Sequence, residues 1–336
     1  MLSKKSIVIL LAVLLVITTF LSVEAKAEPK FVLKYSVAAM PTVAHAKAIE
    51  VFAEEIEKLT NGQIIVETYY GGQLFSQEGQ QNAVRRGALE MTNTDLNWLA
   101  NYVPYLNMLA APYFFKDYEH MTAVMNGDIG KEIADDVAKK TNVRMLSSWY
   151  MGTRQLNLRD IGKEVKTPSD MKGVKLRMPN SPSWLYMGKA LGANPTPVNI
   201  NELYMALKTG TVDGQENPLP NSIKRKFYEV TKYTILTGHY VNPIISVINE
   251  DKWQELGPEL QEKMYAAEEK AREFCDSTII KEAKEGYDIL KEKGMVFIEV
   301  DLDLWKEKVL GYYLADEKMI TNWDMELYEK VQKAAQ

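Results

Sequence analysis

The sequence predicts an α/β protein of two lobes, in which mixed, mainly parallel sheets are flanked by helices. Strand-like and helical segments alternate from residue 31 onward, an order typical of parallel sheets with helices on their faces. The chain has 336 residues, which is enough for two domains. It contains no low-complexity segment and no Pro/Gly/Ser-rich linker. We therefore expect structured segments, and not a flexible tether, to join the lobes.

The first expected lobe opens with a strand, a helix and a second strand. Residues 31–37, FVLKYSV, alternate in hydrophobicity, and Ile49, Phe52 and Ile56 form one apolar stripe of a helix. The expected elements are strands over 31–37 and 63–70 and helices over about 43–59 and 79–87. Ligands of such sheets collect at the carboxyl ends of the strands. Loops beside a ligand are therefore expected at 71–72, 94–95 and 152–154.

The second expected lobe begins near Gly152 and is organised around residues 173–218, GVKLRMPNSPSWLYMGKALGANPTPVNINELYMALKTGTVDGQENP. Thr167 and Pro168 begin a compact helical turn that ends at Gly173. A short strand then delivers Arg177. The further expected elements are a helix closed by Gly192, an extended connector over 194–197, a helix over 202–209 with Asn201 as N-cap and Gly210 as stop, a strand over 240–248, a long helix over about 258–293, a strand over 295–298 and a terminal helical region.

The N-terminus has the pattern of a secretory signal peptide. Lys4 and Lys5 precede an apolar run over residues 7–17, and Ala25-Lys26-Ala27 supplies a small-x-small cleavage site. The apolar run is shorter than the ~20 residues that a membrane span needs. We expect residues 1–27 to be removed as a signal peptide and the mature protein to be free in the periplasm.

Composition and motifs argue against several function classes. A formal net charge of −5 without basic clusters argues against a nucleic-acid partner. The sequence contains no GxSxG, GxGxxG or GxxxxGK[ST] motif and no His-rich metal spacing, so we expect no enzyme activity, no cofactor and no protein-bound metal. The single cysteine, Cys275, excludes an intrachain disulfide framework.

Two polar side chains stand in rigid, extended backbone at the ends of short elements. Met178-Pro179 ends the segment that carries Arg177, and Pro218 holds Asn217 extended. The planar fork of arginine binds a carboxylate through two parallel, charge-assisted hydrogen bonds, which lysine cannot copy. The pattern predicts a site for a small polar anion. By sequence alone, a surface arginine paired with an acid and an asparagine that stabilises its own turn fit these positions as well.

Several motifs resemble one family of transport proteins. The stretches KLRMPNSP, GANPTPVNINELYMALKTG and VDGQENPL are similar to the extracytoplasmic solute-binding subunits of tripartite ATP-independent periplasmic (TRAP) transporters. The similarity covers nearly all of the mature chain, from FAEEIEKLTNGQIIVETYYGGQL to FYEVTKYTILTGH. It implies a two-lobed periplasmic binding protein fold with crossing strands and a long bracing helix. The implied lobes are 28–151 plus 243–282 and 152–242 plus 283–336, with the ligand cleft between them.

The resemblance also implies a function and a set of contacts. A monomeric receptor would capture a small organic acid and deliver it to TRAP permease subunits in the membrane. Arg177 would pair with the carboxylate of the acid, with Arg154 beside it and the Asn217 amide reaching the ligand. His45 either donates to the ligand or serves capping and packing. The expected ligand-binding residues are Arg177, Arg154, Asn217, Ile200, His45, Glu78, Asp95 and Trp184.

The nature of the acid is the least determined point. Two arginines facing one monocarboxylate would leave a buried positive charge, so either the ligand brings a second acidic or strongly polar group, or Asp95, Glu78 or Glu216 supplies the balance. Ile200 stands where relatives that bind sugar acids often carry an aromatic ring. We therefore expect a small mono- or dicarboxylate, such as a C4-dicarboxylate or a 2-oxo acid. The alternatives are a uronate or sialic-acid-like ligand and a ligand-sensing receptor for a membrane kinase.

Overall fold

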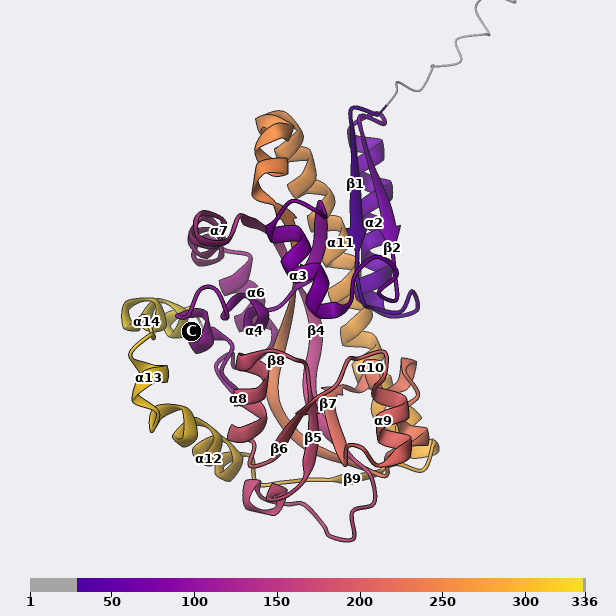
Figure 1. The fold of residues 1–336 in the computed structure, drawn as a ribbon, viewed down its shortest axis with the longest axis vertical. Coiled ribbons are helices and arrows are strands. Elements are labelled where there is room, and N and C mark those ends of the chain that lie inside the picture. Colours follow the sequence, from indigo (N-terminus) through magenta and orange to yellow (C-terminus); the bar gives the residue numbers. More distant parts are fainter. Residues whose placement is uncertain (1–28, 335–336) are drawn as a thin grey trace, which may run out of the picture.

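The computed structural model describes residues 29–334 and contains one mixed sheet that continues through both lobes (Figure 1). The strand order is β2-β1-β3-β8-β4-β7-β5-β6, and β9 also pairs with β8. Pairing of the shorter strands is mostly parallel, as the alternation of strands and helices predicted. The α/β class is thereby confirmed. The expected signal peptide, residues 1–27, lies outside the described residues.

Two long strands, β4 (Val143–Leu158) and β8 (Tyr233–Asn249), join the lobes. They pair antiparallel from Val143 opposite Asn249 to Leu158 opposite Tyr233, and in Figure 1 they run from the upper to the lower half of the molecule. Register shifts near residues 150–152 and 154–156 bend the pair between the lobes. The crossing strands are therefore present, and they give the lobes a continuous, bendable connection.

The prediction of a loop at residues 152–154 was wrong, because these residues lie inside β4. Gly152 has φ +115°, and a Cβ added there would lie 2.7 Å from the Cβ of Pro218 in the neighbouring strand. Glycine thus allows both the bend and the close approach of β7 without interrupting the strand.

The first lobe surrounds the upper part of the sheet. Its elements are β1 (Phe31–Ser36), α2 (Ala44–Leu59), β2 (Ile64–Tyr69), α3 (Gln77–Arg85), β3 (Met91–Thr94), α4 (Leu96–Leu99), α5 (Leu106–Leu109), α6 (Tyr118–Met125) and α7 (Asp128–Thr141). Helix α2 buries Ile49, Phe52 and Ile56, so the predicted apolar stripe faces the core.

The second lobe surrounds the lower part of the sheet. Its elements are the 3₁₀ helix η1 (Pro168–Met171), β5 (Lys175–Met178), α8 (Pro182–Ala190), β6 (Asn194–Pro197), α9 (Leu203–Thr209), β7 (Gly214–Pro218), α10 (Leu219–Lys224), η2 (Phe227–Glu229), β9 (Val296–Ile298), α12 (Leu302–Leu314) and α13 (Glu317–Ile320). The expected connector over 194–197 is the edge strand β6, a position where prolines are tolerated. Asn201 is not the N-cap of α9, which begins at Leu203 after Glu202.

A long helix, α11 (Glu250–Glu292), packs against α2 and β4 in the first lobe and against α10 in the second. Gly257, with φ +74°, interrupts it just before Pro258, so the continuous brace begins where the sequence predicted. The C-terminal helix α14 (Met325–Lys333) differs from expectation. It places Leu327 and Val331 in the core of the first lobe, although residues 283–336 were assigned to the second.

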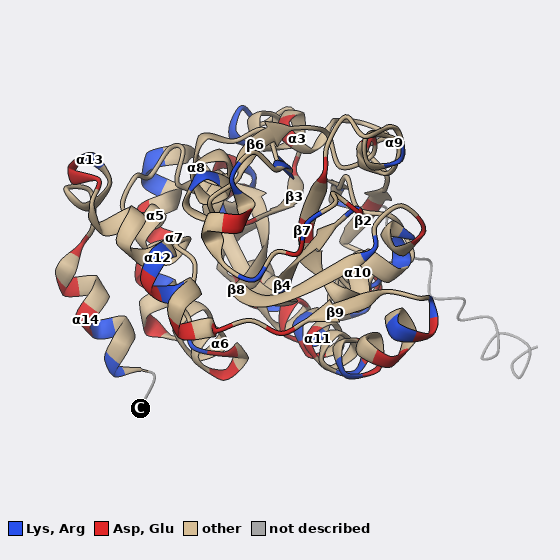
Figure 2. Cartoon of the chain, turned by 90° about the horizontal axis from the view of Figure 1, so that it is seen from below, with Lys and Arg blue, Asp and Glu red and all other residues tan. Residues whose placement is uncertain are grey.

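The outer helices carry charges of both signs. Acidic and basic residues are interspersed along α7, α11 and α12 (Figure 2), and many form local pairs such as Lys263 with Glu259. Between residues 29 and 334, no helix is long and apolar enough to cross a membrane.

Candidate ligand-binding site

A cavity lies between the lobes, where the crossing strands bend. The empty space between its walls, including open solvent at its mouth, is about 620 Å³. The residues that line it are Ala38, Ala39, Val43, His45, Gln77, Gln80, Asn93, Asp95, Met151, Arg154, Arg177, Pro179, Trp184, Ile200, Asn217, Asn221, Arg225 and Ile244. All but one of the eight residues expected from the sequence are in this set, Glu78 being the exception.

Arg177 is held rigidly but is only partly bonded. It lies near the end of β5, its side chain is buried, and its Nε donates to the backbone oxygen of Val198 at 2.8 Å. Its Nη2 is buried and has no hydrogen-bond partner. Burial lowers the pKa of Arg177 to about 9, opposed by the charge of Glu216 and reinforced by Arg154 and Arg225. The group remains a cation at neutral pH, and an anion in the cavity would satisfy its free N–H groups.

Arg154 is already paired. Its Nε and Nη2 donate to both carboxylate oxygens of Glu216, the Nη2–Oε1 distance being 2.7 Å. Its Nη2 also reaches the Glu216 backbone oxygen at 2.8 Å, and Nη1 donates to Asn242 Oδ1 at 2.8 Å. Its guanidinium carbon lies 4.8 Å from the ring centre of Trp184. The charge of Arg154 is thus compensated inside the protein, by one of the three carboxylates considered from the sequence.

Glu216 stays ionised although it is fully buried. Burial acts to raise its pKa, but the charge of Arg154 and hydrogen bonds from His239 and Arg154 outweigh burial and hold the pKa below its usual value. His239 Nε2 lies 3.4 Å from Glu216 Oε2. Burial lowers the pKa of His239 despite the Glu216 carboxylate, so the imidazole is neutral and this contact is a hydrogen bond and not an ion pair.

Asn217 lies in β7, next to the ion pair and on the cavity wall. Its Nδ2 donates to Gln215 Oε1 at 2.5 Å, and its Oδ1 accepts a long hydrogen bond from Asn221 Nδ2 at 3.5 Å. In the pairing of β7 with β4, Asn217 lies opposite Gln155 and Pro218 opposite Arg154, and both Asn217 and Arg154 line the cavity. The side chain is thereby fixed with one N–H direction and one lone pair left for a ligand.

The first lobe supplies a neutral histidine and a carboxyl group whose pKa lies near neutral pH. His45 is buried near the start of α2, its Nδ1 has no partner, and burial and the charge of Arg225 lower its pKa to about 4. Asp95 caps α4 by accepting from the backbone N–H groups of Asn97 and Trp98 at 2.8 and 3.2 Å. Burial raises the Asp95 pKa to about 7, although the Arg154 charge opposes this.

Two of the expected ligand-binding residues have surroundings that were not foreseen from the sequence. Glu78 is exposed and lies outside the cavity lining, where its carboxylate accepts a hydrogen bond from Asn180 Nδ2 at 2.9 Å. Trp184, expected as a ligand-binding residue, lines the cavity although it is almost fully buried, and its Nε1 has no partner. Ile200 contributes an apolar section of wall, as expected.

Sequence reasoning missed further lining residues. Gln80 and Asn93 meet where α3 packs on β3, with Gln80 Nε2 donating to the Asn93 backbone oxygen at 3.2 Å. Gln80 Oε1 and Asn93 Nδ2 are buried without partners. Arg225 follows α10 and also lines the cavity. Its place in the run Lys224-Arg225-Lys226 gives no local signal that the middle residue turns inward.

The two lobes touch around the mouth of the cavity. Asn201 Nδ2 donates to the Gly71 backbone oxygen at 3.0 Å, and Asn180 Nδ2 donates to Glu78 across the same boundary. Arg225 Nη2 reaches the Ala38 backbone oxygen at 3.4 Å. Each contact joins a residue of the second lobe to one of the first, so the conformation is a closed one.

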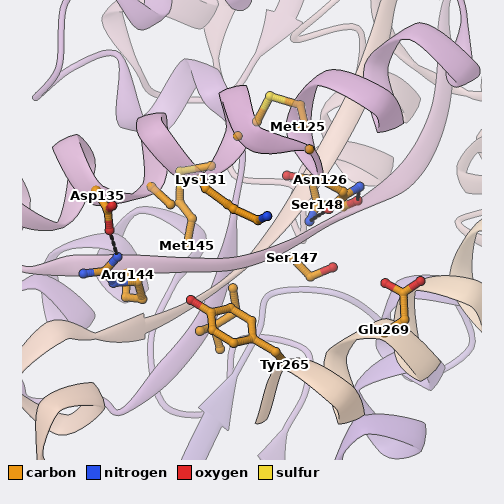
Figure 3. A pocket seen from close by; sticks show the side chains of 14 residues that line it. Met125, Asn126, Lys131, Asp135, Arg144, Met145, Ser147, Ser148, Tyr265 and Glu269 are labelled. Carbon is orange, nitrogen blue, oxygen red and sulfur yellow. Dashed lines mark hydrogen bonds and ion pairs between the residues drawn. The ribbon is translucent and has the colours of Figure 1, made fainter. Parts of the chain in front are cut away.

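A larger hollow of about 1070 Å³ lies elsewhere, between β4, α6, α7 and α11 (Figure 3). Its main cation, Arg144, is already paired with Asp135 and with Glu250, at an Nε–Oε2 distance of 2.9 Å. None of its lining side chains has a buried polar atom without a partner. In the part of the chain that the structure describes, no group of three or more His, Cys, Asp or Glu could hold a metal. The cavity between the lobes is therefore the better candidate site.

Comparisons with known proteins identify the family of this chain. The family model of bacterial extracellular solute-binding protein, family 7 (DctP), matches residues 36–317. The chain is 30% identical over 293 residues to the sialic acid-binding periplasmic protein SiaP of Vibrio cholerae, which covers 87% of this chain and 90% of that protein.

Two solved structures of TRAP periplasmic solute-binding proteins from Roseobacter denitrificans are similar to the whole fold. One, with bound 3-deoxy-D-manno-oct-2-ulosonic acid, has 34% identity and a TM-score of 0.85 and covers 90% of this chain and 99% of that chain. The other, with bound L-galactonate, has 31% identity and a TM-score of 0.82, and the match covers 92% of this chain and 100% of that chain. The family predicted from the KLRMPNSP and VDGQENPL stretches is confirmed. This chain belongs to the bacterial extracellular solute-binding protein family 7, the family of the TRAP solute receptors.

Proposed function

We propose that this chain is a periplasmic receptor that binds a hydroxylated organic acid between its lobes and delivers it to a TRAP-type permease. The carboxylate of the ligand binds to Arg177, and Asn217 and Trp184 donate beside it. No chemical step is involved, because the site holds and encloses the ligand without transforming it. The bound acids of the two Roseobacter structures support this ligand class.

One observation carries the proposal. The Nη2 of Arg177 is buried, belongs to a group charged at neutral pH and has no partner, while Arg154 is paired with Glu216. An unpaired buried donor on a charged group is costly. A carboxylate that accepts two parallel hydrogen bonds from Arg177 removes this cost and gains strength from the low dielectric of the closed cavity.

The neutral groups around Arg177 support a ligand with hydroxyls. His45 Nδ1, Gln80 Oε1, Asn93 Nδ2 and Trp184 Nε1 are buried polar atoms without partners, and they come from both lobes. Hydroxyl groups, which both donate and accept, suit such a mixed set of atoms. This preference revises the expectation of a plain C4 or 2-oxo acid, which would leave most of these atoms unsatisfied.

Thermal shift followed by calorimetry on the purified mature protein tests the proposal. The panel contains L-galactonate, 3-deoxy-D-manno-oct-2-ulosonate, sialic acid, a hexuronate, succinate and a 2-oxo monocarboxylate, with galactitol as the uncharged control. A hydroxylated acid at 100 times its dissociation constant should stabilise the protein by ~2.7 kcal/mol. Binding of galactitol as tight as that of L-galactonate, or binding of succinate alone, would contradict the proposal.

A further inference from the structure

The charges inside the cavity do not balance. Arg154 is neutralised by Glu216, and its charge also opposes the rise in the pKa of Asp95. Arg177 and Arg225 remain. Within residues 29–334, neither of them forms an ion pair with a carboxylate, and no carboxylate offsets the effect of burial on Arg225. A ligand with a single carboxylate would leave one of these two cations unpaired in a closed site.

Arg225 is placed to act on a ligand. It directly follows α10, lines the cavity and is half-buried. Burial lowers the pKa of Arg225 to about 10, so it remains a cation at neutral pH. Its hydrogen bond from Nη2 to the Ala38 backbone oxygen is long, at 3.4 Å, and it occupies one of the five N–H donors of the guanidinium. Most of its donors are therefore available.

A neutral histidine lies beside this arginine. His45 and Arg225 line the same cavity, and the charge of Arg225 contributes to the lowered pKa of His45. Because His45 is uncharged, its unpartnered Nδ1 can take part without adding a third positive charge. His45 comes from the first lobe and Arg225 from the second, so closure assembles the pair.

We propose that Arg225, assisted by His45, forms a second anion subsite in the cavity, and that the ligand therefore carries a second acidic group at some distance from the carboxylate bound by Arg177. This inference rests on the proposed function, because it assumes that Arg177 binds the first carboxylate. The ligand class is a hydroxylated dicarboxylate, or a hydroxylated acid with another terminal anion such as a phosphate.

A structural role for Arg225 is the competing explanation. An arginine at the C-terminus of a helix that contacts a carbonyl of the other lobe could simply hold the lobes together. In that case, changing Arg225 would weaken the binding of mono- and dianionic ligands equally. The two explanations therefore differ in which ligands lose affinity when Arg225 is changed.

The test measures the affinity of matched acids by calorimetry. Gluconate, glucarate and 6-phosphogluconate share one six-carbon skeleton and differ in the group at carbon 6, which is a hydroxyl, a carboxylate or a phosphate. Threonate and tartrate make the same comparison of one carboxylate with two on a four-carbon skeleton. Wild-type protein should bind at least one two-anion ligand ~10-fold or more tightly than its monoacid partner. Arg225→Gln should weaken that ligand by about 30-fold or more and leave the monoacid within ~3-fold, while Arg225→Lys should restore part of the loss. Glucarate and 6-phosphogluconate separate a carboxylate from a phosphate.

Lys226→Gln is the matched control, because it removes the same charge from an exposed neighbour and should change neither affinity. Equal losses for mono- and dianionic ligands in Arg225→Gln, or wild-type binding that ignores the second anion, would overturn the subsite while leaving the organic-acid receptor intact. If no acid in either panel binds to the wild type, or if Arg177→Ala binds all of them normally, the proposed function itself fails.

Discussion

Glu216→Gln should strongly destabilise the protein, because it leaves a charged arginine buried beside a neutral amide. Arg154 keeps its hydrogen bonds to Asn242 Oδ1 and to the backbone oxygen of residue 216, both at 2.8 Å, but loses two charge-assisted bonds to the carboxylate. Breaking a buried ion pair from one side costs about 3–5 kcal/mol. That is a large fraction of the ~5–15 kcal/mol that stabilises an ordinary domain.

Urea unfolding at pH 7, followed by far-ultraviolet circular dichroism, measures the effect. Glu259→Gln is the matched control, since it removes a carboxylate from the exposed pair with Lys263 and should leave the unfolding midpoint near that of the wild type. The double variant Arg154→Met with Glu216→Gln should recover much of the stability lost in the single variant, because no uncompensated charge remains. A loss below ~1 kcal/mol for Glu216→Gln would refute the view that Glu216 neutralises Arg154.

Three further predictions concern the first lobe, the crossing strands and the cleft. Burial raises the pKa of Glu268 to about 8, so the native state holds a proton that the unfolded chain releases near pH ~4.3. The free energy of unfolding should therefore fall as pH rises between these two values. Glu268→Gln should flatten this slope in unfolding curves measured from pH 4 to 9. Gly152→Ala places a Cβ 2.7 Å from Pro218 at φ +115° and should cost ~1–3 kcal/mol by urea unfolding; a wild-type midpoint would contradict the close approach. Asn201→Ala removes the hydrogen bond to the Gly71 backbone oxygen. It should weaken ligand binding by about 2- to 12-fold and leave the stability of the ligand-free protein unchanged. Unchanged affinity in calorimetry would exclude a role of Asn201 in holding the cleft closed.

Much of the fold could be predicted because local patterns agree with the final structure. The apolar stripe of α2 and the strand, helix and proline signals around Arg177 need no knowledge of distant residues. Arg177 could be proposed as a ligand contact for the same reason. Met178-Pro179 ends β5 locally, whatever the rest of the chain does.

Other features depend on long-range packing and leave no local mark. Arg154 meets Glu216 only because β4 and β7 pair in the register that places Leu156 opposite Glu216. Gly152 suggested a loop, since nothing in its neighbourhood indicates that β8 continues the pairing on both sides of it. Arg225 stands between two lysines, and its place on the cavity wall follows from how α10 lies against the cleft. The tertiary contacts of these residues, and not their local secondary-structure propensities, determine where they lie.

Calorimetry on two variants of Arg177 shows whether this residue binds the ligand carboxylate. The tightest acid of the panel is titrated into wild-type, Arg177→Ala and Arg177→Lys proteins, with circular dichroism as the check on folding. Leaving a buried carboxylate unpaired costs ~2–5 kcal/mol, so Arg177→Ala should bind roughly 30- to 4,000-fold more weakly. Arg177→Lys should recover only part of the loss because it lacks the planar fork. If folded Arg177→Ala protein binds the acid within a few-fold of the wild type, the carboxylate does not bind at Arg177 and the account of this site is wrong.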